Sequence, residues 1–466
     1  MNRRSFLSTC GKAALGAAAL PGQAWGQAAR KPNLVFILAD DLGYGDLGCY
    51  GQKMIRTPCL DQMAAEGVRF TDCYAGSTVC APSRCALMTG FHMGHALIRG
   101  NGTVPLRPDD VTVAKILKDA GYATGIVGKW GIGEAGSTGV PTRQGFDSWF
   151  GYLNQVHAHN YYPDFLWRNE EKVPIEGNVC QKGIASQRTQ YSHDLFTREA
   201  LEFVRRHKNH PFFLYLAYTI PHANNELMRA SGNGMEVPSD EPYANESWPQ
   251  PQKNQAAMVT RMDRDIGLLL ALLKELGMDQ DTAVFFSSDN GPHKEGGGNP
   301  ALLRSAGPLR GCKRDLYEGG IRVPMIVRWP GRIPPGTVSA QPWAFWDFLP
   351  TAGEIAGAKP PDGLDGISML PALLGHPQRS HDFLYWEFHE RGFDQAVRLG
   401  DWKAVRHGIR KPIELYDLRT DIGEAHDLAA QHPGIVAKIE TCLKTARTES
   451  GDWPIREPGP REKKQA

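Results

Sequence analysis

The feature that most constrains the fold of this chain is an alternation of short apolar runs with longer amphipathic stretches between residues 30 and 375. The apolar runs have the length of buried strands and are bounded by turn-forming residues; they span residues 33–40, 123–130, 211–218, 282–289 and 323–329. Apolar residues at helical spacing fill intervals between them, over residues 111–120, 193–206 and 256–276. Apolar strands that alternate with helices are typical of a large, mainly parallel sheet sandwiched by helices. We therefore predict an α/β domain over residues 30–375.

The pattern changes after residue 375. Short, closely spaced strand candidates follow at residues 383–388, 395–399, 402–406 and 414–418, and a helix is predicted over 434–448. This order predicts a small antiparallel sheet with one packed helix, as a C-terminal α+β subdomain over residues 376–466. The charged tail from Arg456 is predicted to be disordered.

The first 29 residues have the composition of a signal peptide. Arg3 and Arg4 precede an apolar, alanine-rich run over residues 13–20, and small residues follow at 24–29. The run is too short to stay in a membrane as a spanning helix, and the paired arginines indicate the twin-arginine export route. We expect an exported, periplasmic or secreted protein with no stable membrane insertion. The alternative interpretation is a disordered basic tail.

Without residues 1–29 the chain carries 49 basic and 51 acidic residues, a net charge of −2. Such a balance gives no general attraction for nucleic acid or for anionic membranes. Affinity for an anionic substrate must therefore come from a local cluster of cations.

The segment from Cys80 to Gly90 reads C-A-P-S-R-C-A-L-M-T-G. Pro82 suits the first turn of a helix and Gly90 suits its end, so we expect Cys80 just ahead of a helix that runs to Thr89. The N–H groups at such a helix start would stabilise a sulfate or an oxyanion. An isolated cysteine in this place would more simply be a buried, inert thiol.

This segment resembles, at every fixed position, the signature C-x-P-S-R-x-x-L-x-T-G of the formylglycine-dependent (type I) sulfatases of the alkaline phosphatase superfamily, within a bacterial arylsulfatase-like subgroup. The resemblance implies an alkaline phosphatase-like fold and hydrolysis of sulfate monoesters. It also implies that a formylglycine-generating enzyme oxidises Cys80 to an aldehyde, one hydroxyl of whose hydrate is the nucleophile. Arg84 should support this residue and help to balance the metal-binding carboxylates.

Two polar pairs end predicted strands, Asp40-Asp41 and Asp289-Asn290. Ligands of open α/β sheets bind outside the carboxyl ends of the strands, so we expect both pairs in one crevice. Their oxygens suit Ca²⁺ or Mg²⁺. The resemblance implies a metal site made of Asp40, Asp41, Cys80, Asp289 and Asn290.

Lys129 and Lys313 lie in segments that also resemble sulfatase motifs, and the resemblance implies that both grip the sulfate group. His222 matches the family histidine that faces the leaving group, and we expect it to protonate the departing alkoxide.

One position departs from the family pattern. Many sulfatases carry a histidine two residues after the first lysine and use it to deprotonate the formylglycine hemiacetal, but this chain has Gly131 there. We expect His159 to replace it, with His293 as the alternative.

The combination of Gly131 with the segment His159-Asn160-Tyr161-Tyr162 resembles a subgroup that acts on sulfated glycans, which suggests a sulfated galactose or N-acetylgalactosamine substrate. Residues 386–389 could add a sugar contact, although strand alternation explains Trp386 and Phe388 more simply. Two alternatives stay open: a phosphonate monoester or phosphodiester hydrolase of the same superfamily, and a non-catalytic binder of sulfated glycan, which Gly131 favours.

Overall fold

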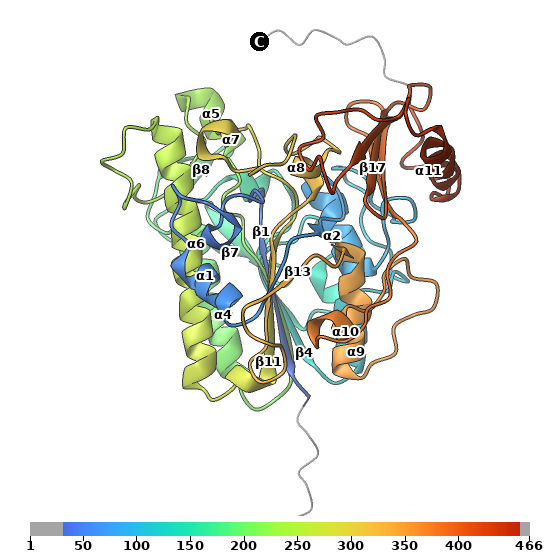
Figure 1. Cartoon of the computed structure of the whole chain (residues 1–466). Coiled ribbons are helices and arrows are strands. Elements are labelled where there is room, and N and C mark those ends of the chain that lie inside the picture. The colour runs from blue at the N-terminus through green and yellow to red at the C-terminus, as the bar shows by residue number, and fades with distance from the viewer. Residues whose placement is uncertain (1–30, 457–466) are drawn as a thin grey trace, which may run out of the picture. The chain divides into compact units, whose positions relative to one another are not determined.

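The computed structural model describes residues 31–456 and contains the predicted parallel sheet, widened to ten strands (Figure 1). Its five central strands are parallel, whereas both margins contain antiparallel pairs. In order across the sheet the strands are β13 (Thr337–Ser339), β2 (Val68–Phe70), β12 (Met325–Arg328), β11 (Thr282–Ser288), β1 (Asn33–Ala39), β10 (Phe212–Ala217), β4 (Ala123–Lys129), β5 (Ser148–Tyr152), β6 (Phe165–Arg168) and β7 (Glu171–Pro174).

The central strand β1 is apolar on both faces because helices cover both faces of the sheet. Leu34 and Phe36 belong to one core cluster, whereas Val35 and Ile37 belong to another. Figure 1 shows the two helical layers on either side of the strands. One layer contains α2 (Cys80–Thr89), α3 (Val113–Asp119) and α9 (Phe348–Ala356); the other contains α1 (Pro58–Ala65), α4 (Ser192–Arg206) and α6 (Gln250–Glu275). The predicted fold class is confirmed.

The C-terminal region forms a four-stranded antiparallel sheet, as predicted, with one long helix packed on it. Trp386 and Phe388 are fully buried in the core, and the Trp386 indole N–H donates to the carbonyl of Ala75, 2.9 Å away. The idea that these two rings contact sugar is therefore wrong; they are packing residues of a strand. The elements are β15 (Leu384–Phe388), β16 (Asp394–Leu399), β17 (Trp402–His407), β18 (Glu414–Asp417) and α11 (Pro433–Thr445).

A buried ion network joins this small sheet to the segment that carries Lys313. The Lys403 ammonium on β17 lies 2.9 Å from a carboxylate oxygen of Glu318 and 3.3 Å from one of Glu424. Glu318 begins the short helix α8 (Glu318–Ile321), which follows Lys313 closely in the chain. The C-terminal sheet thus fixes the position of a loop that reaches the candidate site.

Two details of the predicted elements need correction. The strand predicted at residues 323–329 is β12, and it pairs antiparallel to β11 because the chain returns beside it without a long crossover helix. The margin strands β6 and β7 were not predicted, and neither was the hairpin of β8 (Val179–Gln181) and β9 (Ile184–Gln187). Most residues of β7 and β8 are exposed, and the apolar run of β6, Phe165 to Trp167, is only three residues long.

The predicted signal peptide, residues 1–29, and most of the charged tail lie outside the described residues. The division of the chain at residue 375 stays a prediction. Within residues 31–456, no helix combines the length and the apolar character needed to cross a membrane.

Candidate active site

The two polar pairs meet at the carboxyl ends of β1 and β11, which are adjacent and parallel. The Asp41 backbone N–H donates to an Asp289 carboxylate oxygen at 3.0 Å, and the Asn290 amide donates to Asp41 at 2.7 Å. Asp41 has a φ of 65°, in the left-handed region that few residues other than glycine occupy. This turn directs its carboxylate back toward the neighbouring strand, so the predicted crevice is present.

The nucleophile segment forms α2, but the predicted start of this helix is slightly wrong. Cys80 is its first residue and Val79 is the N-cap, while Gly90 ends the helix with a φ of 76°. The Cys80 thiol lies 3.5 Å from a carboxylate oxygen of Asp40. Burial, reinforced by Asp40, raises the pKa of the Cys80 thiol well above its usual range. An unmodified thiol in this place stays protonated and is a weak nucleophile.

Arg84 ties the helix to the strand ends. Its guanidinium donates to Asp289 at 2.8 and 3.1 Å and to the backbone carbonyl of Lys129 at 2.7 Å, and it lies 3.3 Å from Asp40. All of these side chains are buried. Arg84 therefore holds α2, β1, β4 and β11 together at one point.

The two predicted sulfate-binding lysines each pair with one aspartate of β1. The Lys129 ammonium lies 2.6 Å from Asp40, and the Lys313 ammonium lies 2.8 Å from Asp41. Burial alone would raise the pKa of Asp40, but Lys129 and the other cations outweigh it and hold this pKa below its usual range. The three carboxylates Asp40, Asp41 and Asp289 are thus matched by three buried cations.

The residues at the strand ends fit a divalent cation. Asp40 and Asp41 supply hard oxygen ligands, and the buried carbonyl oxygen of the Asn290 side chain has no hydrogen-bond partner among the described residues. Ligand atoms of Asp40, Asp41, Cys80 and His222 lie within 4.8 Å of one another. Asp289 lies beside them: one of its carboxylate oxygens accepts from Arg84 and the other from the Asp41 backbone N–H, and its role as a ligand stays a prediction.

His222 belongs to that cluster but is held by other contacts. Its Nδ1 lies 2.8 Å from the carbonyl of Ala223, and its Nε2 lies 3.2 Å from the Lys313 ammonium. Because Nε2 accepts from a lysine, we assign the cation site to oxygen atoms. Burial, with Lys313 adding to it, lowers the pKa of His222 to about 3. His222 is therefore neutral beside the lysine.

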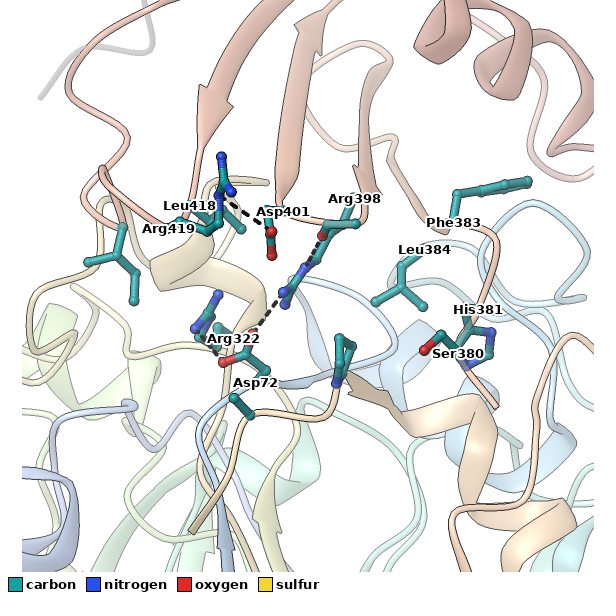
Figure 2. A pocket seen from close by; sticks show the side chains of 14 residues that line it. Asp72, Arg322, Ser380, His381, Phe383, Leu384, Arg398, Asp401, Leu418 and Arg419 are labelled. Carbon is teal, nitrogen blue, oxygen red and sulfur yellow. Dashed lines mark hydrogen bonds and ion pairs between the residues drawn. The ribbon is translucent and has the colours of Figure 1, made fainter. Parts of the chain in front are cut away.

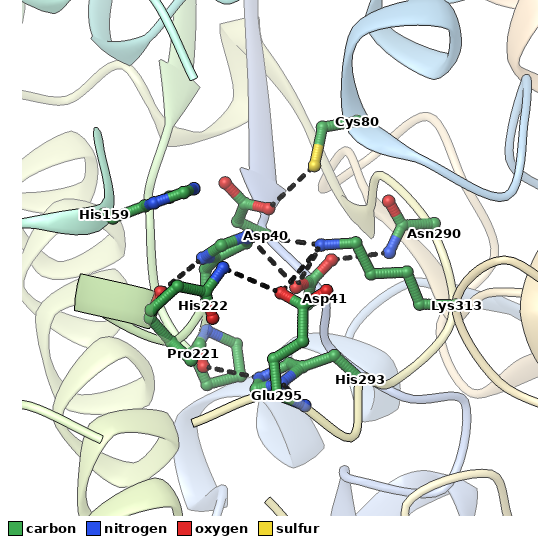
Figure 3. A network of polar contacts seen from close by, with 12 residues as sticks. Asp40, Asp41, Cys80, His159, Pro221, His222, Asn290, His293, Glu295 and Lys313 are labelled. Atoms are coloured by element: carbon green, nitrogen blue, oxygen red, sulfur yellow. Dashed lines mark hydrogen bonds and ion pairs between the residues drawn. The ribbon is translucent and has the colours of Figure 1, made fainter. Parts of the chain in front are cut away.

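The backbone at Gly131 disfavours a histidine. Gly131 has a φ of 79°, which strains any residue with a side chain, and a Cβ atom on it would lie 2.5 Å from the side-chain nitrogen of Gln155, so that Gln155 would have to move. His159 approaches from another element, and its ring stacks on His222 with 5.0 Å between ring centroids. Figure 3 shows this ring pointing toward Asp40.

His293, the alternative to His159, has both ring nitrogens engaged. Nε2 lies 3.1 Å from the carbonyl of Pro221, and Nδ1 accepts from the backbone N–H of Glu295 at 3.1 Å. A histidine bonded in this way is a structural residue.

Comparison with known proteins gives the family of this chain. A family model described as Sulfatase matches residues 32–358, and one described as N-sulphoglucosamine sulphohydrolase, C-terminal, matches residues 312–449. N-acetylgalactosamine-6-sulfatase from Canis lupus familiaris is 34% identical, with 84% of this chain and 73% of that protein covered. Arylsulfatase A from Homo sapiens is 32% identical, with 89% and 87% covered. The chain belongs to the sulfatase family.

The solved structures agree with this assignment. The crystal structure of Ps i-CgsB in complex with k-i-k-neocarrahexaose has a TM-score of 0.79 at 31% identity, and it covers 92% of this chain and 95% of that one. A phosphonate monoester hydrolase, SpPMH from Silicibacter pomeroyi, shares only the fold, with 19% identity and a TM-score of 0.63. This sulfatase is accordingly a sulfuric ester hydrolase.

The sequence analysis missed two acidic residues that reach the site, Glu226, which contacts His159, and Glu295. Glu295 lies 3.8 Å from the Lys313 ammonium, accepts from the Asn225 amide at 3.2 Å and forms an ion pair with Arg314. Lys313 lowers the pKa of Glu295 against the effect of burial. Its position six residues after Asp289 was the only signal available, and a charged residue in a glycine-rich loop is not distinctive.

A cavity lined by two arginines lies outside the candidate active site. A cavity of about 350 Å³ lies where the C-terminal sheet meets the core, and Figure 2 shows Arg322 and Arg398 in its wall. Asp72 pairs with both, at 3.1 and 2.7 Å, and Glu318 also pairs with Arg322, so two carboxylates face the two arginines. No residue of the Cys80 cluster lines this cavity, so the chemistry belongs to the strand ends.

We predict that Ca²⁺ or Mg²⁺ stabilises this sulfatase through Asp41. At an ion concentration of about 100 times Kd, binding to the folded state alone adds roughly 2.7 kcal/mol to the free energy of unfolding. The melting temperature should therefore rise on adding the ion to chelator-treated protein. The rise should be much smaller in Asp41→Asn and unchanged in the control Asp109→Asn, at an exposed position. An equal rise in Asp41→Asn would refute the assignment.

Proposed function

We propose that this sulfatase removes sulfate from a sulfated glycan, using a formylglycine made from Cys80 and a bound Ca²⁺ or Mg²⁺. The observation that carries the proposal is the placement of Cys80 at a helix start, 3.5 Å from Asp40 and within the electrostatic influence of the buried Lys129 and Lys313. The buried cluster has no excess charge by itself, so a divalent cation would give it a charge of +2. That charge suits an anionic sulfate ester.

A formylglycine can release the sulfate that it takes up, which an ordinary hydroxyl nucleophile cannot do in the same way. A hydrated aldehyde supplies one hydroxyl that attacks sulfur and a second that loses its proton as the aldehyde re-forms and inorganic sulfate leaves. A serine lacks the second hydroxyl. Lys129 and Lys313 would hold the sulfate oxygens and neutralise charge that develops in the transition state.

His222 is placed to protonate the departing alcohol together with Lys313. Its Nε2 accepts a hydrogen bond from the Lys313 ammonium, 3.2 Å away. A bound sulfate ester would bring negative charge next to this pair and favour a protonated imidazole. We assign to the pair the delivery of one proton to the leaving oxygen.

His159 is the residue that we assign to the second proton transfer. It lies on the opposite side of His222 from His293, and its ring points toward the Cys80 cluster (Figure 3). Burial and the cation of Lys129 lower the pKa of His159, which keeps it neutral and able to accept a proton.

A glycan substrate is supported by the relatives. The neighbour with a TM-score of 0.79 was solved with a neocarrahexaose, and several curated relatives are N-acetylgalactosamine-6-sulfatases. We infer a sulfated galactose or N-acetylgalactosamine residue as the sugar.

Glycan hydrolysis and the Cys80 nucleophile are tested together. Purified protein should release inorganic sulfate from sulfated galactose and N-acetylgalactosamine saccharides, and Cys80→Ala should abolish release. Cys85→Ala, at the other cysteine of the same helix, is the matched control and should stay active. Binding of the saccharide without sulfate release would indicate a non-catalytic binder, and preferential cleavage of a phosphodiester would indicate the superfamily alternative.

Maturation and export form the second part of the proposal. We propose that a formylglycine-generating enzyme converts Cys80 in the cytoplasm and that the twin-arginine route then exports the folded protein. Peptide mass spectrometry of the exported protein should show an aldehyde at position 80 and an N-terminus near residue 30. Replacing Arg3 and Arg4 by lysine should retain the protein inside the cell. Active exported protein with an unmodified thiol would disprove the first claim.

Replacing His159 by alanine should separate the two half-reactions. One equivalent of alcohol should appear in a burst, while sulfate stays bound to the enzyme and turnover falls by roughly 10²–10⁴. The control is His157→Gln on the same turn, because the His157 ring packs on Phe165 instead. Unchanged turnover in His159→Ala would count against the assignment.

A further inference from the structure

Glu226 contacts His159 and has no place in the reaction assigned so far. Its carboxylate oxygen lies 3.0 Å from Nδ1 of His159, and the two side chains are only 19% and 15% exposed. Glu226 lies in the first turn of α5 (Asn225–Ser231), an element remote in sequence from the turn that carries His159.

The carboxylate is held in place before any substrate binds. The Asn224 side chain caps α5 by accepting from the Leu227 N–H at 3.0 Å. The Glu226 side chain packs against Gly183, where a Cβ atom would lie only 3.0 Å from it. Arg229, which is 76% exposed, approaches the other carboxylate oxygen at 3.5 Å from the solvent side.

This contact decides which nitrogen of His159 carries the proton. A carboxylate only accepts hydrogen bonds, so Nδ1 must donate and Nε2 of the neutral ring keeps its lone pair. The ring is nearly parallel to His222, at 12°, and points into the cluster (Figure 3). The charged groups of Lys129, Lys313 and Glu226 act on it.

We propose that Glu226 is the positioning residue that keeps His159 in the Nδ1–H tautomer, with Nε2 ready to accept a proton in the second half-reaction. The proton passes from the remaining hydroxyl at position 80 to Nε2, and then to water once sulfate has left. Without Glu226 the ring can take the other tautomer, whose Nε2–H cannot accept. This inference rests on the proposed function, in which His159 is the base.

The test is a double-mutant cycle. Glu226→Met keeps the length of the side chain but removes the acceptor, and Glu226→Ala serves as a second variant in case the first folds poorly. Either change should lower kcat by about 10-fold or more, but by no more than the roughly 10²–10⁴ expected from loss of the general base itself, with little change in KM. Sulfate should stay bound to the enzyme, as in His159→Ala. The double variant with His159→Ala should be no slower than His159→Ala alone, because Glu226 acts through His159.

A second readout does not depend on turnover. In protein labelled with ¹⁵N-histidine, the signals lost in His159→Ala identify this ring. The wild type should show a protonated Nδ1 and an unprotonated Nε2, whereas Glu226→Met should shift both signals toward a mixture of tautomers. Arg229→Ala, which removes only the outer partner of Glu226, is the matched control and should change neither the signals nor kcat.

Two results would overturn the inference. One is a loss of kcat from Glu226→Met that is as large in the His159→Ala background as in the wild type. The other is an unchanged Nδ1–H tautomer in Glu226→Met. If instead the wild type releases no sulfate from any glycan, or His159→Ala is fully active, the proposed function fails first, so the two failures are distinguishable.

Discussion

The arrangement of this protein depends on a balanced set of buried charges at the carboxyl ends of β1, β4 and β11. Asp40, Asp41 and Asp289 are matched by Arg84, Lys129 and Lys313 in a region closed to solvent. Removing one partner of a buried ion pair typically costs about 3–5 kcal/mol, because the remaining charge is left unpaired and dehydrated. The same residues therefore maintain the fold around the site and supply its chemistry.

Three histidines lie in a row next to these charges, and their surroundings give them different properties. The rings of His159, His222 and His293 are separated by 5.0 and 5.9 Å. His293 has both nitrogens bonded to backbone groups, His222 accepts from a lysine, and His159 faces a carboxylate. Residue type alone gives no basis for ranking them, whereas their partners suggest one structural residue, one proton donor and one base.

The C-terminal sheet contributes to the site indirectly. Lys403 binds Glu318 close to Lys313, and Trp386 packs beside the segment that leads into α2. Between the two regions, Arg322 and Arg398 are paired with Asp72 and Glu318, so these two arginines give the cavity no cationic excess. The buried rings of β15 are not available for substrate recognition.

The sequence by itself determined the fold class, since strands apolar on both faces require helices on both sides, and it identified the Cys80 segment and the polar pairs that end two strands. These signals are local: a strand run, a helix start and a motif each lie within about ten residues. Only the tertiary structure decided which nitrogen of each histidine has a partner, that Gln155 occupies the space above Gly131, and that Glu226 and Glu295 reach the site. Contacts of this kind join side chains far apart in the chain, and no periodicity or spacing in the sequence records them.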